Sequence, residues 1–95
     1  MISQRYVPLG FQQLDATALS AAVGLTVPPG ANYALLIAET AGVRWRDDGT
    51  APTSSVGMLI AQDATLEYSG NLSMIKFIAA SGSPLLNVSY YRAVG

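Results

Sequence analysis

VRWRDDGT, at residues 43–50, contains the two local patterns that together indicate the fold class of this chain. Successive side chains of an extended strand point to opposite faces, so Trp45 lies on one face and Arg44 and Arg46 on the other. Asp47-Asp48-Gly49 then has the composition of a turn that ends the strand. The stretch also holds four of the eleven charged side chains of the protein. It predicts a short amphipathic strand followed by a turn.

Similar short runs follow one another along the chain, separated by turn residues at positions 8–10, 28–30, 69–71 and 81–84. Short runs rich in β-branched and aromatic residues between such signals are typical of a β-sandwich or barrel. Residues 15–22 alone have helical composition, enough for one or two turns. The other runs predict about eight strands, at residues 11–15, 23–27, 33–39, 42–46, 57–60, 65–68, 74–80 and 86–92. We therefore expect an all-β fold, a small β-sandwich or a jelly-roll-like barrel.

The length of 95 residues is sufficient for one domain with a single core, which we expect to span residues 11–95. Residues 1–10 differ, because Pro8 lies within the run and cannot donate a ladder hydrogen bond. This segment is either a flexible tail or an extended N-terminal arm that pairs with the sheet edge of a neighbouring subunit. In the second case Arg5 and Tyr6 are interface residues, and removal of the arm would weaken assembly while leaving the domain folded.

The composition limits the class of function. Apolar residues make up 51% of the chain and charged residues only 12%, which is about half the charged share of a typical soluble domain. Such a small domain exposes apolar surface, and this favours a permanent partner over a free monomer. The net charge of -1 provides no basic field for nucleic acid. No apolar run has the ~20 residues of a membrane span, and no signal peptide is evident, so we expect synthesis in the cytoplasm.

Catalysis and metal binding have few residues to support them. The chain has no histidine and no cysteine, which removes the usual general base, the commonest metal ligand and thiolate nucleophiles. No Gly-x-Ser-x-Gly or phosphate-binding glycine motif occurs. Asp47 and Asp48 could offer oxygen ligands to calcium, with Asp63 or Glu67 as distant partners, but a calcium loop needs a longer series of oxygens. We expect a non-enzymatic protein without cofactor or metal.

The charged stretch is therefore interpreted as a structural corner. Trp45, the largest side chain, is expected to anchor the strand in the core. The carboxylates of Asp47-Asp48-Gly49 are expected to cap backbone amides and pair with arginines in the turn. Two roles stay open for Arg44 and Arg46. They either hold this turn, through exposed ion pairs worth under about 1 kcal/mol, or contact a partner as interface residues.

Several stretches of the chain, taken in order, also resemble the sequences of a known family of proteins. It begins with VPPGA at residues 27–31 and with residues 43–53, of which Arg44-Trp45-Arg46-Asp47-Asp48-Gly49-Thr50 is the most specific part. It continues through residues 56–58, 66–72, 75–78 and 87–91, and spans residues 23–92 in all. In these stretches the chain resembles small virion-associated proteins of tailed bacteriophages and prophages.

This resemblance implies a structural protein of the virion, in particular a head decoration or cement protein that stabilises the capsid. Such proteins are small β-rich modules that clamp capsid subunits and often cluster as trimers. The expected partners are the chain itself, as a homo-oligomer such as a trimer, and the major capsid protein or another virion protein. The alternative is a tail or baseplate component that binds a carbohydrate or a receptor. Its tyrosines argue against a sugar platform, because Tyr90 and Tyr91 point to opposite strand faces and Tyr6, Tyr33 and Tyr68 are scattered along the sequence.

Overall fold

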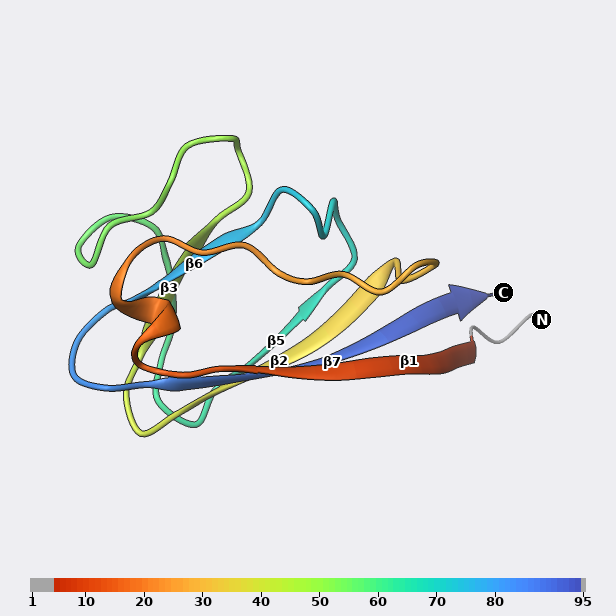
Figure 1. Ribbon diagram of the computed structural model, residues 1–95, viewed down its shortest axis with the longest axis horizontal. Coiled ribbons are helices and arrows are strands. Elements are labelled where there is room, and N and C mark those ends of the chain that lie inside the picture. Colours follow the sequence, from red (N-terminus) through yellow and green to blue (C-terminus); the bar gives the residue numbers. More distant parts are fainter. Residues whose placement is uncertain (1–4, 95) are drawn as a thin grey trace.

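The computed structural model describes residues 5–94, which form two antiparallel sheets packed against each other (Figure 1). Sheet A has the strand order β1-β7-β2-β5, and sheet B has the order β4-β3-β6. Their bounds are β1 Arg5–Leu14, β2 Tyr33–Glu39, β3 Val43–Arg46, β4 Met58–Ile60, β5 Thr65–Tyr68, β6 Lys76–Ala79 and β7 Leu85–Val94. The predicted all-β sandwich is thus confirmed. Within the described residues, no helix is long and apolar enough to cross a membrane.

Local sequence patterns located most of these strands. The strands β2 and β5 have the predicted bounds, and β3, β4, β6 and β7 differ from prediction by one or two residues at their ends. The predicted strand at residues 23–27 is wrong, because only Val23 forms a bridge, to Phe77 of β6. Further along this segment, the amide of Thr26 donates to the Gln12 side chain at 3.0 Å instead of to a neighbouring strand.

The stretch of helical composition is a single turn of 3₁₀-helix, η1, at Ala18–Ser20. The Asp15 carboxylate accepts a hydrogen bond from the Ala18 amide at 2.9 Å, as an N-terminal cap does. Leu19 points from this turn into the core and is fully buried. The short turn is therefore stabilised by packing and not by its own length.

The predicted N-terminal arm is extended over its described part, residues 5–10, but its partner is the same chain. These residues belong to β1 and pair with β7, from Arg5 opposite Val94 to Gly10 opposite Tyr90. Pro8 is tolerated because an edge strand leaves one side of its backbone unpaired. The register shifts between Pro8 and Gly10, which accommodates the irregularity. Removal of residues 1–10 would therefore take away part of sheet A itself; residues 1–4 lie outside the described residues.

The core lies between the two sheets and follows the period-two alternation of the strands. From sheet A it takes Leu36 of β2 and Val88 and Tyr90 of β7, and from sheet B it takes Val43 and Phe77. The Tyr90 hydroxyl donates to Gln12 Oε1 at 2.6 Å, and burial raises the pKa of Tyr90 to about 12. No buried side-chain nitrogen or oxygen of residues 5–94 lacks a hydrogen-bond partner. The buried side-chain polar groups of the described sandwich are thus satisfied.

Candidate functional site

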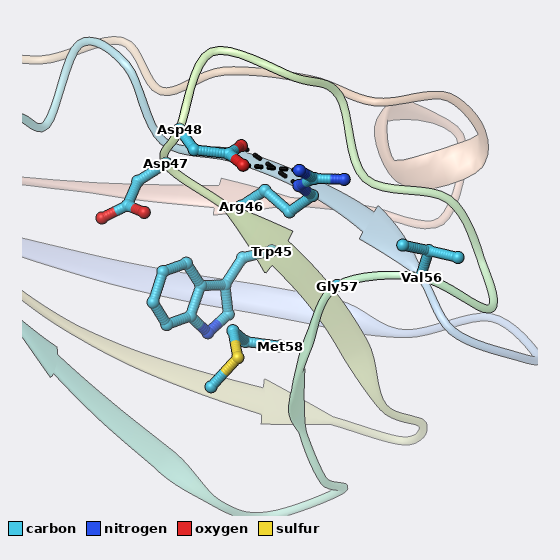
Figure 2. Close-up of a pocket in the computed structure, with 7 residues that line it drawn as sticks. All are labelled: Trp45, Arg46, Asp47, Asp48, Val56, Gly57 and Met58. Atoms are coloured by element: carbon cyan, nitrogen blue, oxygen red, sulfur yellow. Dashed lines mark hydrogen bonds and ion pairs between the residues drawn. The ribbon is translucent and has the colours of Figure 1, made fainter.

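A pocket with a volume of ≈ 630 Å³ lies where β4 separates from β3. The two strands pair only as far as Trp45 opposite Met58. At Gly57 the backbone takes a φ of 140° and leaves the sheet. The walls come from both sides of this separation (Figure 2): Trp45, Arg46, Asp47, Asp48, Val56, Gly57 and Met58. We call this feature the Trp45 pocket, and it contains most of the corner that the sequence predicts.

Trp45 joins the two sheets at this end of the sandwich. Its half-buried side chain packs against the core, and its ring meets that of Tyr68 edge to face, with centroids 5.8 Å apart and planes at 70°. The Tyr68 hydroxyl donates to Asp47 Oδ2 at 2.6 Å. Burial, followed by this hydrogen bond, raises the pKa of Tyr68 to about 12. A strand of sheet A is thus tied to the turn that follows β3.

The turn itself is held by Arg46 and Asp48. The guanidinium donates twice to the carboxylate, from Nη2 to Oδ2 at 2.5 Å and from Nε to Oδ1 at 3.1 Å. This pairing lowers the pKa of Asp48 and raises that of Arg46. Asp48 Oδ1 also accepts from the Thr50 amide, and Gly49 closes the turn with a φ of 89°. Such an exposed pair orients the turn more than it stabilises the fold.

Arg44 has a different partner, the loop that returns from this turn to β4. Its Nε donates to the Ser54 carbonyl at 3.1 Å, and its Nη1 donates to the Gly57 carbonyl at 2.9 Å. The loop is thereby fixed against the outer face of sheet B, where Pro52 is buried. Both arginines of the corner thus have partners in their own chain, and their contact with another protein stays a prediction.

Three tyrosines that are scattered along the sequence meet on the outer face of sheet A. Tyr33 of β2 lies directly opposite Tyr91 of β7, and the Tyr6 ring contacts both, with centroid distances of 4.7 to 6.2 Å among the three. The Tyr33 hydroxyl donates to Glu67 Oε1. Tyr90 points into the core, so the predicted opposition of Tyr90 and Tyr91 is confirmed. The cluster arises from strand register, which spacing in the sequence does not reveal.

Other apolar side chains extend this cluster over the sheet. By the same alternation, Phe11 of β1 and Leu35 and Ile37 of β2 point outward. Phe11 is 67% exposed and was missed by the sequence interpretation. Arg5 and Tyr6 are both exposed, but adjacent positions of β1 point to opposite faces, so only Tyr6 joins the cluster. We call this surface the tyrosine face; it consists of Tyr6, Phe11, Tyr33, Leu35, Ile37 and Tyr91.

Asp47 and Asp48 are the carboxylates that the sequence offers as oxygen ligands for a metal ion. Residues 5–94 contain no group of three or more histidine, cysteine, aspartate or glutamate side chains placed to hold a metal ion. No family model matches the chain, and no match was found among curated proteins or solved structures. The two surface features, the Trp45 pocket and the tyrosine face, are therefore interpreted from their own geometry.

The hydroxyl of Tyr33 makes stability sensitive to alkaline pH. Its hydrogen bond to Glu67 is the main cause that raises its pKa from 10.0 to about 12. Between these values the folded chain keeps a proton that the unfolded chain releases. The contribution of Tyr33 to the free energy of unfolding is therefore fully present below pH 10 and is lost as the pH rises toward 12. Urea unfolding at a series of pH values measures this slope. The Tyr33→Phe variant keeps the ring and should show a shallower slope than wild type; an unchanged slope would contradict the assignment.

Proposed function

We propose that this protein is a non-enzymatic structural protein that assembles through exposed apolar surface. The observation that supports this most directly is the tyrosine face, an aromatic and aliphatic sheet surface over which the described chain places no further layer. Outward positions of a sandwich normally carry polar side chains. Tyrosine and phenylalanine are enriched at protein interfaces, where one end of the ring is apolar and a hydroxyl can bond.

The size of this face suits a stable interface. The four strands of sheet A have 10, 10, 7 and 4 residues. At ~3.3 Å per residue and ~4.8 Å between strands, this side of the sheet has a surface on the order of 500 Å². Burial of such an area on each of two partners approaches the lower end of stable protein interfaces, on the order of 1,200 Å² in total. The low charge of the chain, 12% of residues, is consistent with this role.

The narrower form of the proposal is a capsid decoration or cement protein of a bacteriophage virion. It is supported by the resemblance of residues 23–92 to such proteins, above all in Arg44-Trp45-Arg46-Asp47-Asp48-Gly49-Thr50. In that role the chain forms a homo-oligomer and binds the major capsid protein, so that apolar surface exposed in the free protein becomes buried in the particle.

Two experiments test this function. Sedimentation equilibrium of the purified full chain should show a concentration-dependent oligomer. Particles induced from a host strain that encodes the chain should contain it when analysed by mass spectrometry, and particles that lack its gene should release DNA at a lower temperature. A monomer that is absent from purified particles would contradict the proposal.

The alternative, a carbohydrate- or receptor-binding tail module, has one observation in its favour. Trp45 lines a concave pocket together with the carboxylates of Asp47 and Asp48. The three clustered tyrosines, however, lie on a sheet face with their rings tilted by 41–76° to one another, which gives sugars no common stacking plane. Because Trp45 is the only tryptophan, saturable quenching of its fluorescence by an oligosaccharide would favour this alternative.

A further inference from the structure

The outer edge of sheet A is the ten-residue strand β1, which within residues 5–94 pairs with β7 on one side only. We call its other side the free edge. Such an edge offers a row of backbone donors and acceptors to a further strand. We propose that residues 11–13 pair along the free edge with the same segment of a second copy, antiparallel and symmetric about Gln12. This inference rests on the proposed assembly role and identifies the strand that joins two copies.

Hydrogen bonds elsewhere in sheet A show which backbone groups of β1 point to the free edge. The Tyr91 carbonyl accepts from the Asn32 amide at 3.0 Å, so the backbone groups of Tyr91 point to β2 and away from β1. Backbone groups of successive strand residues point alternately to the two sides of the strand. The residues two and four positions earlier in β7 therefore also point to β2, and they lie opposite Phe11 and Gln13. The amides and carbonyls of Phe11 and Gln13 thus point to the free edge.

The hydrogen bonds of β2 lead independently to the same assignment. The amide and the carbonyl of Ala38 bond to residues 64 and 63 at 3.3 and 2.7 Å, which places its backbone groups on the β5 side. The preceding residue, Ile37, therefore points to β7, where its partner is Asn87. Asn87 is also the residue opposite Gln13 of β1. Because Asn87 bonds to β2, Gln13 has its backbone groups on the free edge.

Pro8 limits the open part of this edge. It lies opposite Tyr91, so by the same rule its nitrogen, which carries no hydrogen, points to the free edge. A proline in this position discourages pairing with another strand. The register shift between Pro8 and Gly10 interrupts the edge further. Beyond it, residues 10–14 keep a regular register with β7, and they carry no charged side chain that would repel a strand.

A second copy fits the open part because its pattern of donors and acceptors is self-complementary. In an antiparallel pair symmetric about Gln12, Phe11 of each copy lies opposite Gln13 of the other. Opposite residues that point to each other exchange both of their N–H···O bonds, so all the outward groups of Phe11 and Gln13 find partners. Symmetry about Phe11 would place Gln13 opposite Leu9, within the register shift. Symmetry about Gln13 would place Phe11 opposite Asp15, beyond the end of β1.

The side chain of Phe11 gains cover in the same arrangement. It is 67% exposed, more than the other large apolar residues of the described chain. The Phe11 residues of the two copies become diagonal neighbours on one face of the joined sheet, about 7–8 Å apart and within reach of aromatic side chains. Aromatic pairs of this kind attract each other beyond the effect of burial alone. The two tyrosine faces then form one continuous surface.

Charge does not oppose the contact. The charged residues nearest to the paired segment along β1 are Arg5 and Asp15. Asp15 lies three positions from the centre at Gln12, so symmetry separates the two copies of Asp15 by about 20 Å, at ~3.3 Å per residue. This exceeds the screening length of about 8 Å at physiological ionic strength. Two chains of like net charge can therefore meet along this strand without direct repulsion between carboxylates.

Hydrogen exchange of the full wild-type chain, resolved by residue with NMR at low and high protein concentration, tests the contact without a variant. The amides of Phe11 and Gln13 should exchange at least about tenfold more slowly in the associated chain, because association gives them acceptors. The Gln12 amide points to β7 in both states and is the internal control. A chain that associates without slowing the Phe11 and Gln13 amides would overturn the edge contact and leave the assembly role standing.

A pair of cysteine variants tests the register. The chain has no cysteine. Under oxidising conditions, Phe11→Cys mixed with Gln13→Cys should form a disulfide-linked dimer, because opposite hydrogen-bonded residues have Cα atoms about 5.5 Å apart, within disulfide range. The control mixture pairs Gln13→Cys with Ile37→Cys, on the same face but in the central strand β2, and should cross-link at least about tenfold less. Thermal unfolding checks that each variant folds.

The outcomes separate the two proposals. Equal cross-linking in the two mixtures, from a wild type that associates, would overturn the register about Gln12 and leave the assembly role standing. A wild type that stays monomeric in sedimentation equilibrium would overturn the edge contact together with the homo-oligomer of the proposed function.

Discussion

Replacement of Phe77 with alanine is expected to lower the free energy of unfolding by about 3–5 kcal/mol. Phe77 is fully buried in β6, directly opposite Trp45 of β3. Its backbone exchanges hydrogen bonds of 2.9 and 2.8 Å with Val23, the point at which the segment after η1 is attached to sheet B. Loss of the ring removes buried apolar contacts and leaves a cavity that the surrounding strands fill only in part. Urea unfolding monitored by Trp45 fluorescence measures the loss.

Ile78→Ala is the matched control for this prediction. Ile78 is the next residue of β6, lies opposite Arg44 on the outer face of sheet B and is only half-buried. Its truncation removes a side chain of similar size without opening the core, and we expect a loss of about 1 kcal/mol. Equal losses for the two variants would show that Phe77 does not hold the two sheets together in the way that its burial indicates.

The strands that could be predicted are those in which local pattern and tertiary environment agree. The run at Tyr33–Glu39 is apolar and bounded by turn residues, and it forms a central strand of sheet A between β7 and β5. Thr65–Tyr68 alternates cleanly, with Leu66 and Tyr68 directed inward. Residues 23–27 also include three β-branched side chains, Val23, Thr26 and Val27, but their segment has only a single bridge to β6. Propensity reports a preference for extended backbone and does not reveal whether a neighbouring strand is present.

The candidate site shows the same division between local and long-range information. Composition and spacing predicted the turn of Asp47, Asp48 and Gly49, because its hydrogen bonds are formed within a few residues. The pocket walls Val56 and Met58 are brought to Trp45 by the pairing of β3 with β4, which no local pattern specifies. The tyrosine face likewise depends on the registers of β1, β7 and β2. Side chains that meet through sheet pairing are therefore the part that single-sequence reasoning missed.

Gly57→Ala is expected to lower the free energy of unfolding by about 2–4 kcal/mol, from backbone strain and overpacking together. The φ of 140° at Gly57 lies in a region that residues with a side chain rarely adopt. An added Cβ would lie 3.1 Å from the Trp45 carbonyl oxygen and 3.2 Å from Cβ of Pro52. These neighbours are backbone and ring atoms that cannot rotate away. Urea unfolding measures the effect, with Gly10→Ala as the control, because its nearest contact would be an ordinary 3.6 Å to Pro28.

The same substitution tests whether the loop at Gly57 holds the walls of the Trp45 pocket together. Strain at Gly57 is relieved when the loop moves away from β3, which breaks the bond from Arg44 Nη1 to the Gly57 carbonyl and separates Met58 from Trp45. Gly57→Ala should therefore lose stability, and hydrogen exchange at residues 53–57 should increase. If hydrogen exchange at residues 53–57 stayed as slow as in wild type while Gly57→Ala was destabilised, the strain at Gly57 would not be relieved through this loop.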